Sequence, residues 1–69
     1  MYAEIRIRGQ IDDHWSAWFE DLEIIQEVES DETLLRGTVI DQAALYGLLA
    51  KLRDLGLALL SVDVAKDVP

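Results

Sequence analysis

The stretch DQAALYGLLAKLRDL, residues 41–55, carries the clearest pattern in the sequence and decides the fold. Asp41 is a good N-cap, and Ile40 before it is placed to pack on Leu45 as a hydrophobic staple. The apolar residues recur at helical spacing and share one stripe, which consists of Leu45, Leu48, Leu49, Leu52 and Leu55. We therefore predict an amphipathic helix over residues 41–55 that buries its leucines.

The residues after this helix predict a turn and a final strand. Gly56 suits the left-handed conformation that follows a last helical turn, with Leu57 placed to contact Leu52 as in a Schellman motif. The next run, ALLSVDVA, predicts a strand whose inward residues are Leu60, Val62 and Val64. We expect KDVP, residues 66–69, to be a short frayed tail, so that one domain covers residues 1–65.

Three more strands are predicted before the helix. YAEIRIRG, residues 2–9, alternates apolar and charged residues as a half-buried strand does. LEIIQEVE, residues 22–29, alternates less cleanly and leaves polar Gln26 on its apolar side. TLLRGTVI, residues 33–40, places Leu35 and Val39 inward, and the short polar connection before it predicts a hairpin.

The stretch DDHWSAWFED, residues 12–21, predicts a short helix. Asp12 or Asp13 serves as its N-cap, and His14 lies exposed in its first turn. On a helix these three side chains point in different directions and no second histidine exists, so we predict no metal site; a weak, oxygen-rich cation site is the alternative. The apolar residues fall on one side, and we expect them to anchor the helix to the core: Ile11, Trp15, Trp18, Phe19 and Leu22.

The order of these elements is strand, short helix, strand, strand, long helix, strand. With right-handed connections and the helices on one face, this order predicts an α+β, ferredoxin-like βαββαβ sandwich with a four-stranded antiparallel sheet. The first and third strands would lie inside the sheet, and the second and fourth would be its edges.

Size and composition limit the classes of function. A domain of 69 residues buries only about 60% of its unfolded surface, and oligomerisation is a common remedy for the thin stability margin. The formal charge of -8 argues against nucleic-acid or anionic-membrane binding, and no apolar run reaches the ~20 residues that span a bilayer. The chain has no cysteine for thiol chemistry and no secretory signal at its start, so we expect a cytoplasmic protein.

The sequence resembles a known group of proteins. The pattern W-S-x-W-F, followed by L-x-G-x-V-x-D-Q-A-A-L-x-G-L-L-x-K-L-R-D-L-G-L-x-L-L-S-V, looks like a group of short, uncharacterised bacterial proteins, and the resemblance covers nearly the whole chain. It implies a compact bacterial α+β domain. The group carries no assigned activity, so the resemblance implies no catalytic residue.

Three surfaces are candidates for binding. The outward side of the predicted sheet carries a possible anion or partner contact at Arg6, Arg8 and Arg36, which cross-strand pairs with Glu23, Glu27 and Asp63 would instead neutralise. The same side carries an apolar group that suggests a symmetric dimer through this face or an edge strand: Tyr2, Ile25, Leu34 and Leu59. The long helix has a small-residue side that suits either a packing partner or plain solvent exposure: Ala43, Tyr46, Gly47 and Ala50.

Enzymatic functions of this topology lack the residues they need. An acylphosphatase needs an anion-binding loop after the first strand and an asparagine, but IRIRGQIDD turns acidic there and the chain has no asparagine. The copper-chaperone variant lacks its cysteine pair, and the RNA-recognition variant lacks strand aromatics and positive charge. Ser16 or Ser61 with His14 and an aspartate forms a catalytic triad on paper only, because the predicted positions give no reason for contact.

We therefore predict a non-enzymatic interaction or regulatory module that forms a homodimer and can bind another protein, without cofactor, metal, nucleic acid or membrane. The alternative is a small-molecule sensor similar in topology to amino-acid-binding ACT domains. Its contacts would be Gly9, Asp12 or Asp13, and Arg6 or Arg8. A hydrolase that uses His14 and a nearby carboxylate ranks last.

Overall fold

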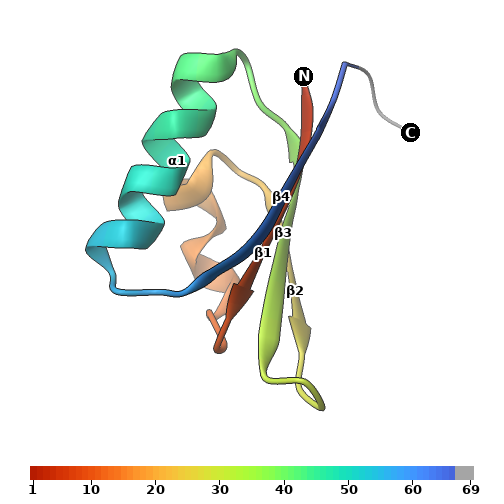
Figure 1. The fold of residues 1–69 in the computed structure, drawn as a ribbon, viewed down its shortest axis with the longest axis vertical. Coiled ribbons are helices and arrows are strands. Elements are labelled where there is room, and N and C mark those ends of the chain that lie inside the picture. Colours follow the sequence, from red (N-terminus) through yellow and green to blue (C-terminus); the bar gives the residue numbers. More distant parts are fainter. Residues whose placement is uncertain (67–69) are drawn as a thin grey trace.

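The computed structural model describes residues 1–66 and has the predicted order of elements (Figure 1). Its strands form one antiparallel sheet in the order β2-β3-β1-β4, so the first and third strands lie inside it as predicted. Both helices cover the same face of the sheet, which confirms the α+β class. The elements are β1 (Tyr2–Arg8), η1 (Asp13–Phe19), β2 (Glu23–Glu27), β3 (Glu32–Thr38), α1 (Gln42–Asp54) and β4 (Leu59–Ala65). The last three residues of the predicted tail lie outside the described range.

The hydrophobic core lies between the helices and the two inner strands. The alternating residues of β1 point into it, and so does Leu35 from β3. These strand residues pack against the buried side of α1. Leu55 was also predicted to be buried, but it is 46% exposed. The core consists of Ala3, Ile5, Ile7, Ile11, Phe19, Leu22, Leu35, Val39, Leu45, Leu48 and Leu52.

A buried threonine fixes the connection between β1 and η1. The Thr33 hydroxyl donates to the Gly9 carbonyl oxygen at 2.6 Å and accepts from the Ile11 N–H at 3.3 Å. The Gln26 side-chain amide donates to the Ile11 carbonyl oxygen at 2.7 Å, which explains the polar residue on the apolar side of β2. These bonds satisfy backbone groups that would otherwise be costly to bury.

The ends of α1 follow the sequence prediction except at one residue. The Asp41 carboxylate accepts the Ala44 N–H at 2.8 Å, so the predicted N-cap is confirmed. The predicted staple is wrong, because Ile40 is 86% exposed. Past the last turn, Gly56 has a φ of +75° and the Leu57 N–H donates to the Leu52 carbonyl oxygen at 3.1 Å. The predicted Schellman closure is therefore confirmed.

The short helix η1 differs from the prediction in its geometry. It is a 3₁₀-helix, in which residues three apart eclipse one another. Phe19 therefore points into the core on one side, while Trp15 and Trp18 share a different side and are 47% and 41% exposed. The prediction that both tryptophans anchor the helix in the core is wrong, because it assumed α-helical spacing.

Strand β4 departs from the prediction through a shift in register. Val62 lies opposite buried Ile5, but the register shifts between Arg6 and Ile7. The extra residue turns Leu59 to face Ile7 on the helix side of the sheet, so its predicted place on the outer face is wrong. The inward residues predicted for β4 are incompletely buried: Leu60 is 39% and Val64 48% exposed.

Candidate functional site

Two of the three candidate arginines are held by carboxylates on the outer face of the sheet. Arg6 pairs with Glu27 and, at 3.2 Å, with Glu32, and Arg36 pairs with Glu23 at 2.9 Å. The hydrogen bond from Glu27 raises the pKa of Arg6, and the one from Glu23 raises the pKa of Arg36. Glu32 was not among the carboxylates that we predicted to pair with the arginines.

These pairs limit what an incoming anion can do. A ligand at Arg6 or Arg36 has to displace a carboxylate that is already in place. Arg8 is exposed, and the ion pairs found among residues 1–66 do not include it. Asp63, a predicted partner for the arginines, lies opposite Glu4 instead. The anion site stays a prediction, and Arg8 is its most accessible member.

The apolar residues of the outer face do not form a continuous patch. Ile25 lies opposite Leu34 across β2 and β3, and both are partly buried. Tyr2 lies in a separate row, because the charged row of Glu23, Arg36, Glu4 and Asp63 crosses the sheet between them. Partial burial and a hydrogen bond to the Glu4 carboxylate, 3.0 Å from the Tyr2 hydroxyl, raise the pKa of Tyr2. This arrangement resembles solvated sheet surface more than an apolar interface.

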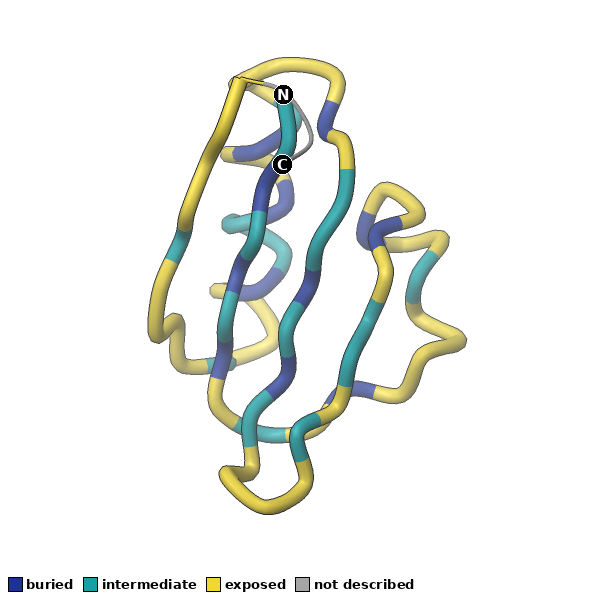
Figure 2. Tube along the Cα trace, turned by 90° about the vertical axis from the view of Figure 1, so that its right-hand side faces the viewer, coloured by how far each residue is buried: buried dark blue, intermediate teal, exposed yellow. Residues whose placement is uncertain are grey.

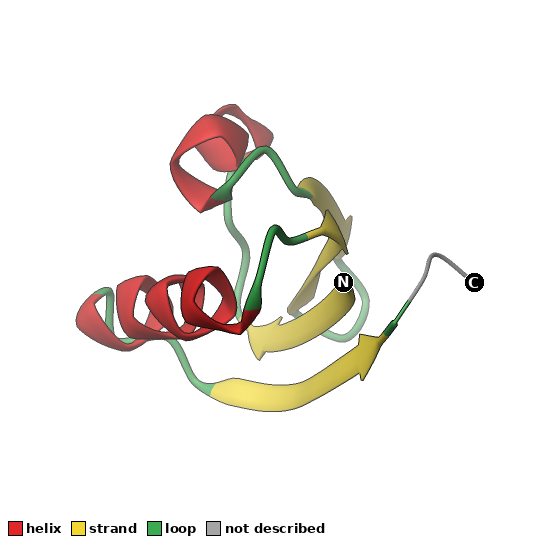
Figure 3. Cartoon of the chain, turned by 90° about the horizontal axis from the view of Figure 1, so that it is seen from above, coloured by secondary structure: helices red, strands yellow, loops and turns green. Residues whose placement is uncertain are grey.

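The β4 edge, defined as Leu59–Ala65, has the opposite character. It carries one charged residue, Asp63, and is exposed along nearly its whole length (Figure 2). Viewed from above, β4 curves away from α1 towards its C-terminal end, so no helix covers its inner side there (Figure 3). An open groove continues the apolar surface onto α1, and it is lined by Leu49, Leu52, Arg53, Gly56, Leu57 and Leu59.

Sequence reasoning named an edge strand as a possible dimer contact, but it missed the exposed apolar residues of β4 because it assigned Leu60 and Val64 to the core. The alternation of ALLSVDVA is the same for a covered strand and for one that the helix layer does not reach. Two predictions together indicated that β4 could be exposed: it was an edge strand, and only two helices were available to cover four strands.

The candidate residues of α1 lie along its outer side. Ala43 and Gly47 are exposed, Tyr46 is 61% exposed, and Ala50 is partly buried. A methyl group added at Gly47 would meet nothing within 4 Å. Packing within the described chain therefore gives no reason for this glycine, and its role in an interface stays a prediction.

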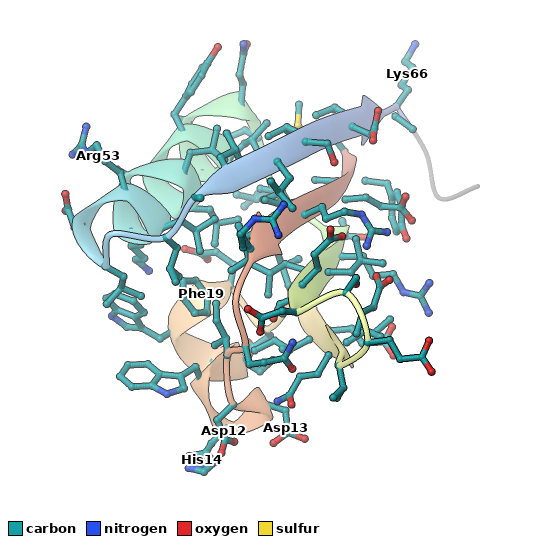
Figure 4. All side chains as sticks on the ribbon, turned by 60° about the horizontal axis from the view of Figure 1, so that its bottom comes forward. Asp12, Asp13, His14, Phe19, Arg53 and Lys66 are labelled. Carbon is teal, nitrogen blue, oxygen red and sulfur yellow. The ribbon has the colours of Figure 1, made fainter. Side chains whose placement is uncertain are left out.

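The acidic end of η1 brings its side chains together, contrary to the prediction. The ligand atoms of Asp12, Asp13 and His14 lie within 4.8 Å of one another. Asp12 caps the helix by accepting the His14 N–H at 3.1 Å, and it also lies 2.6 Å from the His14 Nδ1. The capping hydrogen bond lowers the pKa of Asp12. The three side chains lie at an exposed end of the molecule (Figure 4). Because exposed acidic groups are common without a bound metal, we assign no metal ion to them.

The loop after β1 is used by the fold itself. The Gly9 N–H donates to the Asp31 carbonyl oxygen at 2.6 Å, and its own carbonyl accepts from Thr33. Both backbone groups of Gly9 are therefore engaged within the chain. The sensor contacts at Gly9 stay a prediction without added support.

A family model described as a domain of unknown function, DUF8691, matches residues 2–63. The chain belongs to this family. The match begins with β1 and ends within β4, so it spans the first five elements and most of the sixth. No curated protein and no solved structure matched the chain. Neither α1 nor any other helix within residues 1–66 is long and apolar enough to cross a membrane.

Proposed function

We propose that this protein is a non-enzymatic interaction module that forms a homodimer through the β4 edge. The observation that carries the proposal is a seven-residue edge strand with exposed Leu59, Leu60 and Val64 and a single charge. Such an edge presents unpaired backbone groups next to apolar side chains, which is a ready template for another strand. Association would bury both.

A second copy fits this edge because β4 is nearly self-complementary. A two-fold axis perpendicular to the sheet at Val62, the midpoint of Leu59–Ala65, sets the seven residues antiparallel to those of the second copy, with regular pairing over residues 61–63 and the extra residue Leu60 towards each end. Val62 then meets its own counterpart, and Leu60 lies opposite Val64. Opposed apolar side chains on one face stabilise antiparallel pairs.

The charges favour the same register. With the axis at Val62, Asp63 lies opposite Ser61 of the second copy, and Arg6 is the next residue beyond that serine. An axis at Asp63 would place two carboxylates directly opposite each other, which destabilises a strand pair. A standard interface buries about 800 Å² per partner, which is roughly a fifth of the 4400 Å² surface. The groove beside α1 therefore has to contribute together with β4.

We further propose that the fold belongs to the ferredoxin-like βαββαβ class and that the protein acts in the cytoplasm. Read from the β4 edge, the strand order is β4-β1-β3-β2, with both helices on one face. This order supports the ferredoxin-like assignment. The cytoplasmic assignment rests on the sequence, which contains no cysteine.

Sedimentation equilibrium tests the dimer. We expect a mass of twice 7.8 kDa for the unmodified chain at micromolar concentration. Val64→Lys should yield a monomer, because its charge would be buried next to Leu60 of the second copy. Val28→Lys is the matched control, since Val28 is 77% exposed in the turn after β2. A monomer at high micromolar concentration in all three samples would exclude the dimer.

The small-molecule sensor is the alternative that a monomer would favour. Ligands that bind the native state raise its stability by RT ln(1 + [L]/Kd). A thermal-shift screen over amino acids, nucleotides and divalent metals, repeated with Arg8→Gln, would then show whether the exposed guanidinium takes part.

A further inference from the structure

The exposed side of η1 carries an aromatic pair, of which only Trp18 contacts the core, with its ring centroid 5.0 Å from that of buried Phe19. Trp15 and Trp18 are the two tryptophans of the chain. Their ring centroids lie 5.6 Å apart in an edge-to-face arrangement, and both side chains are more than two-fifths exposed. Tryptophan is usually well buried, and exposed tryptophans are enriched where proteins bind partners. The pair therefore points to a contact surface separate from the β4 edge.

One of the two rings already holds a cation from the chain itself. Lys51 Nζ lies 5.2 Å from the centroid of the Trp18 ring and donates to the Trp18 carbonyl oxygen at 2.6 Å. The Glu20 carboxylate lies 3.9 Å from the same ammonium. A ring face, a carbonyl and a carboxylate thus combine to bind an ammonium group.

The surface around Trp15 also combines an aromatic ring with carboxylates, but its own segment supplies no lysine or arginine. The segment of residues 12–21 contains four carboxylates and one histidine, and no lysine or arginine. Among the ion pairs of residues 1–66, Asp12 meets only His14, and none includes Asp13 or Asp21. Three of the four carboxylates near Trp15, those of Asp12, Asp13 and Asp21, are therefore paired with no lysine or arginine of residues 1–66.

We propose that the η1 aromatic surface, formed by Trp15, Trp18, Asp12 and Asp13, binds a basic segment of a partner protein. An arginine or lysine of that segment packs against the Trp15 ring while a second cation meets the aspartates. The partner differs from this chain, because the chain has a net charge of -8 and two of its four arginines, Arg6 and Arg36, are paired with glutamates on the sheet. This surface is independent of dimer formation.

The test uses the full chain and a fluorescently labelled tetra-arginine peptide, with binding followed by anisotropy at low and at physiological salt. We expect Trp15→Ala to weaken binding by about fivefold, the effect of losing one exposed cation–π contact. Tyr46→Ala removes an aromatic side chain that is 61% exposed on α1, and it should leave binding unchanged. Equal effects of the two substitutions would overturn the proposal.

Because Trp15→Ala could also weaken binding by disturbing the fold, two further variants of equal charge test the surface independently. Asp13→Asn and Glu29→Gln each remove one exposed carboxylate, at η1 and at the turn after β2. Asp13→Asn should weaken the peptide more than Glu29→Gln at both salt concentrations. Equal weakening would mean that the overall negative charge of the protein binds the peptide, and the proposal would be wrong.

The proposal would also be wrong if Trp15→Ala lowered self-association of the free chain, since a second copy would then occupy the surface.

Discussion

The two edges of the sheet have different chemistry although they belong to the same small domain. β2 is five residues long and carries Glu23 and Glu27, which pair with arginines of the inner strands. η1 packs beside it. β4 is seven residues long, with one carboxylate and several exposed apolar side chains.

This difference predicts which edge strand remains exposed to solvent and which one pairs with another chain. Short edge strands with charged residues resist pairing with other chains, whereas long apolar edges invite it. The β2 edge is protected in this sense and the β4 edge is open. The asymmetry favours a closed dimer over an extended assembly, since only one edge of each chain is available for pairing.

The largest expected effect concerns the protection of β2 by η1. Phe19 is fully buried, and Phe19→Ala should lower the free energy of unfolding by about 3–5 kcal/mol. Trp18→Ala is the matched control, because its ring is 41% exposed and its loss should cost much less. Chemical denaturation of both variants measures the difference. Equal losses would mean that the exposed tryptophan anchors η1 after all.

The next largest effect concerns β3, which joins the two halves of the sheet. Gly37 has a φ of +152°, and a methyl group there would lie 2.9 Å from the Leu22 Cδ2 atom. Gly37→Ala should therefore lower stability by about 1–3 kcal/mol through backbone strain and a clash at the start of β2. The measurement is again chemical denaturation, and an unchanged midpoint would contradict this account of the β2 side.

A smaller and opposite effect is expected on the side of α1 that faces solvent. Gly47→Ala should raise stability by up to about 1 kcal/mol, because the added methyl group meets open space and alanine favours the helix. Dimer formation should not change, since Gly47 belongs neither to β4 nor to the lining of the groove beside α1. A loss of the dimer in sedimentation would instead place the interface on the outer side of α1.

The smallest effect is a pH dependence of the η1 cap. The pKa of Asp12 is lowered in the folded chain, so its cap contributes stability above the ordinary value of 3.8 and loses it as the pH falls through the lowered pKa. Thermal unfolding between about pH 6 and pH 2 should therefore show a slightly steeper loss for the unmodified chain than for Asp12→Asn. Glu29→Gln controls for the change in net charge, and identical slopes for all three would contradict the cap.

The sequence predicted those features that depend on neighbouring residues. Asp41 and Gly56 fix the ends of α1 through local backbone geometry, and the alternation of β1 fixes its buried side. These determinants lie within a few positions of the structure that they specify, and the order of the elements left few arrangements of the strands.

The failures have physical reasons that lie outside a local pattern. Trp15 and Trp18 were misplaced because the 3₁₀ geometry of η1 changes which residues share a side. Leu59 was misplaced because the register of β4 shifts against β1. Leu60 and Val64 were assigned to the core because the reach of the helix layer depends on tertiary packing. The open β4 edge emerges only when the last two facts are combined.

Amide hydrogen exchange at low and high protein concentration tests the difference between the two edges most directly. We predict that alternate amides of β4 between Leu59 and Ala65, those that point away from β1, become protected as the concentration rises. Amides on the free side of β2 should exchange at the same rate throughout. Concentration-independent exchange along β4, or equal protection of both edges, would contradict the proposal that this protein associates through β4.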